Sequence, residues 1–114
     1  MTNTAEVQTE GWLTVCESSN LVNLLGVRAL INGEQVAIFR VKDKLFGISA
    51  FDPFSNAAVL SRGIVGDLQG QLVVASPIYK QHFNLETGQC LEDESVQLKT
   101  YSVREVDGNV QILV

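Results

Sequence analysis

The most informative part of the chain is residues 45–93, which read LFGISAFDPFSNAAVLSRGIVGDLQGQLVVASPIYKQHFNLETGQCLED. Two short segments within it each contain a proline: Asp-Pro-Phe at 52–54 and Ser-Pro-Ile-Tyr at 76–79. The first is followed by AVLSRG at 58–63, and the second is followed by FNLETG at 83–88. Because the proline segments are separated by runs that favour strands, we expect two loops that face each other across a long hairpin.

The composition is that of one ordinary globular domain spanning residues 1–114. With 46% hydrophobic and 18% charged residues, the chain can bury a core without disulfide staples. The net charge is −5 and the basic residues are scattered, so we expect no nucleic-acid partner. There is no secretory segment and no apolar run that could span a membrane, so we expect a cytoplasmic protein with reduced Cys16 and Cys90 packed in the core. Residues 1–11 have no periodic apolar positions and are expected to be flexible.

Turn signals at short intervals predict an all-β fold. Asn32-Gly33 and Asp107-Gly108 each separate two runs rich in β-branched residues, which is the pattern of a tight hairpin. No stretch of a dozen residues has the 3.6-residue period of a helix, and only residues 57–61 could form a helical turn. We predict an antiparallel sandwich or barrel in which residues 45–93 form a small inserted subdomain with the two loops.

Two further features of the fold follow from the residue pattern. The run Val36-Ala37-Ile38-Phe39 has apolar residues on both parities, so this strand is expected to be covered on both faces. Residues 66–70 are rich in Gly and Asp and are expected to form the turn between strands at 63–65 and 71–75.

The two loops resemble the cluster-binding core of a Rieske iron–sulfur domain. In that family a Cys-x-His loop and a Cys-x-x-His loop, each with a proline, hold one [2Fe–2S] centre through two thiolates and two imidazoles. The resemblance aligns on Pro53, Pro77 and residues 85–88. The four former ligand positions are occupied by Asp52, Phe54, Ser76 and Tyr79.

The number of possible ligands in the chain also argues against a cluster. The chain has two cysteines and one histidine, His82, which makes three soft ligands where a Rieske centre needs four. Cys16 also lies far upstream of the loops. We therefore expect a Rieske-like fold that binds no metal and no cofactor of its own.

Over most of its length the chain is similar to a narrower family, the small subunits of the cytoplasmic NAD(P)H-dependent nitrite reductases of enteric bacteria. Members of the enteric type lack the four cluster ligands, as this sequence does. The shared motifs, in order, lie at residues 35–40, 46–49, 52–54, 59–63, 74–77 and 90–94.

This resemblance implies an accessory subunit in nitrate assimilation with no active site of its own. Its role would be the assembly or stability of a large subunit that reduces nitrite to ammonium. The FAD, the iron–sulfur cluster and the sirohaem of such an enzyme are expected in the large subunit. This chain has no glycine-rich dinucleotide-binding loop, which agrees with the expectation that the cofactors lie in the large subunit.

Phe54 and Tyr79 are the candidate residues for binding the large subunit. Without a metal, apolar packing must offset the conformational entropy of ordering the two loops. One interpretation is that both rings plug the vacated site; the other is that part of this surface stays exposed and docks, since aromatic residues are favoured interface anchors. We favour the plug for Phe54 and docking for Tyr79, whose hydroxyl prefers an exposed or hydrogen-bonded end.

Other interpretations of the same residues are weaker. Asp52, Ser76 and His82 contain the residue types of a hydrolase triad, but no nucleophile elbow precedes a helix. The acidic residues at 92–94 lack the alternating spacing of a calcium loop, so a solvated surface or contact with a basic partner is expected. The main rival is a free-standing β-domain that binds a small ligand without an enzyme partner.

Overall fold

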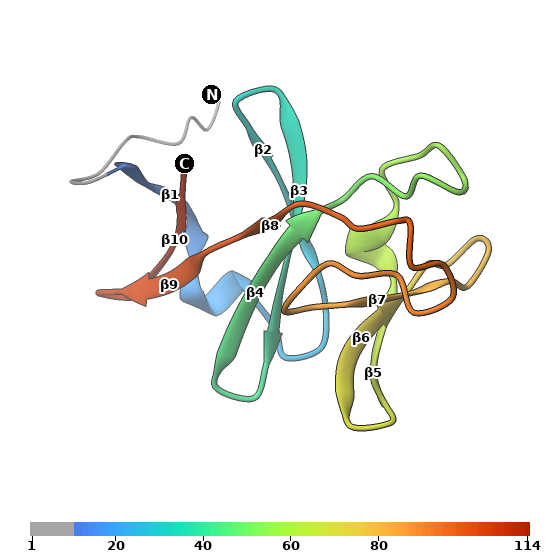
Figure 1. Cartoon of the computed structure of the whole chain (residues 1–114). Helices are drawn as coiled ribbons and strands as arrows, with labels where there is room; N and C mark the ends of the chain where they lie inside the picture. Colours follow the sequence, from blue (N-terminus) through green and yellow to red (C-terminus); the bar gives the residue numbers. More distant parts are fainter. Residues whose placement is uncertain (1–10) are drawn as a thin grey trace.

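The computed structural model describes residues 11–114 and is built almost entirely from β-strands (Figure 1). The predicted flexible segment therefore falls, except for Gly11, outside the described residues. In chain order the strands are β1 (Trp12–Glu17), β2 (Val27–Ile31), β3 (Glu34–Val41), β4 (Lys44–Ser49), β5 (Ile64–Leu68), β6 (Gln71–Ala75), β7 (His82–Asn84), β8 (Thr100–Tyr101), β9 (Val103–Val106) and β10 (Asn109–Leu113). Two 3₁₀ turns, η2 (Ser18–Asn20) and η3 (Leu60–Arg62), complete this part of the chain. The all-β prediction is confirmed.

The strands form three antiparallel sheets. The central sheet has the order β2-β3-β4-β8, a second sheet joins β1, β10 and β9, and a small sheet joins β5, β6 and β7. Figure 1 shows the central sheet between the other two, with the small sheet at the right. The structure places β4, the first part of the predicted subdomain 45–93, in the central sheet. Across residues 11–114, no helix has the length and apolarity needed to cross a membrane.

Strand β3 lies between two hydrophobic cores. Val36 and Ile38 pack into a core with residues of β1 and β10, whereas Ala37 and Phe39 pack into a core with residues of the small sheet. All four side chains are fully buried. Burial of a large apolar side chain contributes roughly 1.5–3 kcal/mol, so both cores depend on this strand. The prediction that it is covered on both faces is confirmed.

The hairpin turns show where the residue pattern was sufficient and where it was not. The hairpin predicted at Asn32-Gly33 is confirmed, and Asn32 (φ 50°) and Gly33 (φ 82°) have the positive φ values of a type I′ turn. The turn predicted at 66–70 is shorter than expected, because β5 continues to Leu68 and only Gln69 and Gly70 separate it from β6. A two-residue turn keeps the strands paired to their ends, and the Asp67 side chain accepts a hydrogen bond from the Gly70 N–H at 3.0 Å.

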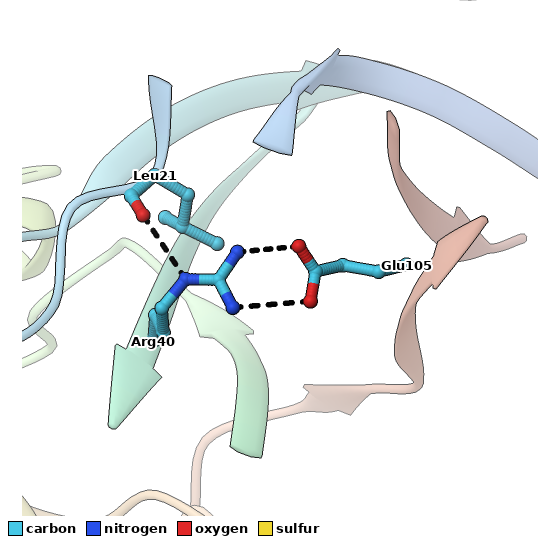
Figure 2. A network of polar contacts seen from close by, with 3 residues as sticks. All are labelled: Leu21, Arg40 and Glu105. Atoms are coloured by element: carbon cyan, nitrogen blue, oxygen red, sulfur yellow. Dashed lines mark hydrogen bonds and ion pairs between the residues drawn. The ribbon is translucent and has the colours of Figure 1, made fainter. Parts of the chain in front are cut away.

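An ion pair connects the central sheet to the second sheet (Figure 2). The Arg40 guanidinium, on β3, donates to both carboxylate oxygens of Glu105, on β9, at 3.0 and 2.6 Å. Its Nε also donates to the Leu21 carbonyl oxygen at 3.1 Å. The hydrogen bond from Arg40 lowers the pKa of Glu105 to about 2.

Candidate functional site

The candidate site is formed by two loops at the side of the small sheet, which we call the tip. Loop 1 (residues 50–63) connects β4 to β5, and loop 2 (residues 76–81) connects β6 to β7. Loop 1 is anchored by the buried residues Ala50 and Leu60, whose backbones are joined by a hydrogen bond of 3.1 Å. Loop 2 is closed by the Ser76 N–H, which donates to the Gln81 carbonyl oxygen at 2.9 Å.

Asp52 and Ser76, which the sequence resemblance assigns to the two former thiolate positions, are in direct contact. Both are buried, and the Ser76 hydroxyl donates to Asp52 Oδ2 at 2.5 Å. Asp52 also accepts hydrogen bonds from the Phe54 N–H at 2.9 Å and from the Ser55 hydroxyl at 3.0 Å, within its own loop. The Ile78 N–H donates to the Ser76 hydroxyl at 3.3 Å. Each of the two side chains therefore shapes its own loop and binds the other loop.

Phe54 and Tyr79, which the sequence resemblance assigns to the two former imidazole positions, have different environments. Phe54 is half-buried against the core, and its ring centroid lies 6.2 Å from that of Phe83. Tyr79 is 60% exposed, and its neighbour Ile78 and the loop 1 residue Phe51 are also exposed. The tip thus has one aromatic ring packed against the domain and a group of large side chains facing outward.

The residues at the tip do not fit a [2Fe–2S] centre, which requires four soft ligands. The Asp52 carboxylate and the Ser76 hydroxyl are hydrogen-bonded to each other. Cys90 is buried in the core beside the small sheet, and Cys16 packs against the other core. Both thiols are free, and burial raises the pKa of each. In the range 11–114, no group of three or more His, Cys, Asp or Glu side chains is placed to hold a metal ion.

His82 and Glu92 form a contact that the sequence did not indicate. The Glu92 carboxylate accepts hydrogen bonds from the His82 backbone N–H at 2.7 Å and lies 2.6 Å from Nδ1 of its ring. Burial favours a higher pKa for Glu92, but the hydrogen bonds from His82 outweigh it and lower the pKa below its ordinary value. Asp93 accepts hydrogen bonds from the backbone and hydroxyl of Ser95. Two of the three acidic residues at 92–94 are therefore engaged within the chain.

A cleft of about 320 Å³ lies next to loop 1, with Phe51 and Ala58 among the residues that line it. Its polar side is formed by Glu34, which accepts hydrogen bonds from Lys99 at 3.0 Å and from the Tyr101 hydroxyl at 2.5 Å. These polar groups are already paired with each other, so a ligand would have to compete with those contacts.

Comparison with known proteins first establishes the class of domain. Residues 11–113 match the family model for the Rieske-like [2Fe-2S] domain. Together with the two loops beside the small sheet, this match shows that the chain is a Rieske-like domain.

The narrower family follows from full-length similarity. The chain is 48% identical over 103 residues to the small subunit of nitrite reductase (NADH) from Salmonella typhimurium, covering 89% of this chain and 95% of the relative. The solution NMR structure of the nitrite reductase [NAD(P)H] small subunit from Erwinia carotovora superposes with a TM-score of 0.78 at 43% identity, covering 94% of this chain and 83% of the other. The chain belongs to the family of nitrite reductase small subunits.

One relative carries a related domain within a much longer chain. The nitrite reductase [NAD(P)H] large subunit from Klebsiella oxytoca is 31% identical over 101 residues, which is 89% of this chain but 11% of that protein. In that enzyme, the related domain is therefore part of the large subunit itself.

Proposed function

We propose that this chain is the accessory small subunit of a cytoplasmic NAD(P)H-dependent nitrite reductase and that it binds the large subunit. The reaction is the reduction of nitrite to ammonium in nitrate assimilation, with FAD, an iron–sulfur cluster and sirohaem in the large subunit. The similarity to a segment of the Klebsiella large subunit is the observation that carries this proposal. A domain that occurs both inside a large subunit and as a separate small subunit is expected to occupy the same place on the enzyme.

The contribution of the chain is structural. The former ligand positions hold a hydrogen-bonded Asp52–Ser76 pair, a packed Phe54 ring and an exposed Tyr79 ring, and these groups cannot transfer electrons as a cluster does. We infer that the subunit supports the assembly or stability of its larger partner.

The tip is the surface that we assign to docking. Tyr79 and Ile78 are large exposed side chains on a short, hydrogen-bonded loop, and Phe51 adds a third large exposed side chain on loop 1. Burial of one such ring against the large subunit would contribute on the order of 2 kcal/mol. Phe54 has a lesser part in docking, because its ring already packs beside Phe83.

Affinity purification of the tagged chain from nitrite-grown cells tests the proposal. A large flavoprotein with nitrite reductase activity should co-purify, and the Tyr79→Ala variant should retain less of it. Retention of no large subunit under mild conditions would contradict the proposal and favour the rival, a free-standing binding domain. That rival would use the cleft beside Phe51, and a small molecule bound there should be lost in a Lys99→Ala variant.

A further inference from the structure

The geometry points to a specific role for Asp52 and Ser76: they form a latch that joins the two loops and holds Tyr79 in its docking position without a metal. The latch is defined as the hydrogen bond from the Ser76 hydroxyl to Asp52 Oδ2. The effect of the latch on the loops does not depend on the proposed function, whereas its effect on docking rests on that function.

The latch is placed where it can replace a cross-link. Its two residues are 24 positions apart in sequence, and both side chains are buried. A hydroxyl that donates to a carboxylate forms a charge-assisted hydrogen bond, which is stronger than a hydrogen bond between neutral groups. Three donors converge on the two oxygens of Asp52, as suits a carboxylate that can only accept.

The latch reaches Tyr79 through the backbone of loop 2. The Ser76 hydroxyl accepts a hydrogen bond from the Ile78 N–H, and the Ser76 carbonyl oxygen accepts one from the Lys80 N–H at 3.1 Å. These two bonds bracket Tyr79. Because Ile78, Tyr79 and Lys80 are all exposed, side-chain burial does little to order this segment. The order of loop 2 must therefore come from its backbone bonds and from the latch.

Loop 1 provides a matched comparison for the latch. The Ser55 hydroxyl also donates to Asp52 Oδ2, at 3.0 Å, but Ser55 lies in the same loop as Asp52. Removal of either hydroxyl deletes one hydrogen bond to the same oxygen. Of these two hydroxyls, only that of Ser76 bonds from one loop to the other.

Amide hydrogen exchange on the isolated chain tests the latch directly. The Asn56 N–H, which donates to the Asp52 carbonyl oxygen, reports on loop 1, and the Lys80 N–H reports on loop 2. Ser76→Ala removes the bond to Asp52 and the bond from the Ile78 N–H, so exchange should become at least about tenfold faster at both amides. In Ser55→Ala, only Asn56 should change. Exchange in β3 should be unchanged in both variants, which checks that the domain remains folded.

Asp52→Asn is the second variant, because it keeps the size of the side chain while replacing one acceptor oxygen by a donor. Exchange should become faster in both loops in this variant as well. It therefore tests the latch even where Ser76→Ala is too unstable to measure. Unchanged exchange at Asn56 in Ser76→Ala, or no effect on Lys80 in Asp52→Asn, would overturn the latch.

Binding of each variant to the purified large subunit separates the latch from the proposed function. Ser76→Ala should weaken binding about tenfold, whereas Ser55→Ala should bind like the parent chain. If Tyr79→Ala binds normally, the docking role of the tip is wrong although the exchange results still establish the latch. If exchange changes in both loops but Ser76→Ala binds normally, the latch does not position the docking residue.

Discussion

Phe54 and Tyr79 lie in the two loops of the tip, yet one ring is packed and the other is exposed. Because of this difference, we expect substitutions of the two residues to have different effects. Phe54 should matter to the stability of the isolated domain, and Tyr79 should matter to its association with the large subunit.

Phe54→Ala should lower the free energy of unfolding by about 2 kcal/mol, less than for a fully buried ring, because Phe54 is only half-buried against Phe83. Chemical denaturation of the isolated chain measures this effect. An unchanged unfolding midpoint would show that the ring does not fill the vacated site.

Tyr79→Ala should leave the free energy of unfolding within about 0.5 kcal/mol of the parent chain, because the side chain is exposed. Its affinity for the large subunit should fall at least tenfold, or about 1.4 kcal/mol. Surface plasmon resonance with immobilised large subunit gives the affinity. Binding that is unchanged in this folded variant would rule out docking through Tyr79.

The Arg40–Glu105 ion pair should make the stability of the domain depend on pH. Because Arg40 depresses the pKa of Glu105 in the folded chain to about 2, the pair stabilises the domain above the ordinary pKa of 4.5, and this stabilisation is lost as the pH falls towards 2. The Glu105 side chain is 37% exposed, so the effect should be at most about 1 kcal/mol. Glu105→Gln should flatten the curve of stability against pH between these values. An identical slope in parent and variant would contradict the assignment.

At the scale of elements, two glycines in turns show how a local turn differs from a long-range contact. Gly33 and Gly88 both have positive φ values, but Gly33 faces open space. A Cβ on Gly88 would lie 2.1 Å from the Leu98 carbonyl oxygen, which belongs to a different segment of the backbone. The same residue type therefore serves a turn at one site and a close approach of two backbones at the other.

Gly33→Ala should destabilise the domain by about 1 kcal/mol through backbone strain alone. Gly88→Ala should cost about 3 kcal/mol or more, because the backbone of residues 88 or 98 must also move. Parallel urea denaturation of the two variants provides the comparison. Equal losses of stability would show that the Gly88–Leu98 approach relaxes freely.

At the scale of the whole molecule, the chain is a Rieske-like domain held together by two cores and a latched tip. We predict that the purified protein is colourless and free of iron, because the side chains at the four ligand positions do not fit a cluster. Anaerobic reconstitution with iron and sulfide, followed by visible absorption and iron analysis, measures this. A cluster-bearing Rieske ferredoxin treated in parallel is the control, and stoichiometric iron in this chain would contradict the prediction.

The sequence by itself was sufficient for the features that depend on neighbouring residues. The type I′ turn at Asn32-Gly33 follows from the φ preferences of two adjacent residues, and the two-sided burial of Val36–Phe39 follows from a pattern of four. The family could also be inferred, because its motifs are short and occur in a definite order. The length of the turn after β5 was predicted wrongly, since strand pairing extends through Gly66 and Asp67 despite their turn preference.

Only the tertiary structure decided which distant side chains meet. The Asp52–Ser76 latch joins residues 24 positions apart, and the Arg40–Glu105 pair joins residues 65 positions apart. Likewise, the Phe54 ring is half-buried because Phe83 lies beside it, whereas the Tyr79 ring has most of its surface in solvent. Polarity and size can be read from each residue, but hydrogen bonds and burial depend on distances that are set when all three sheets pack together.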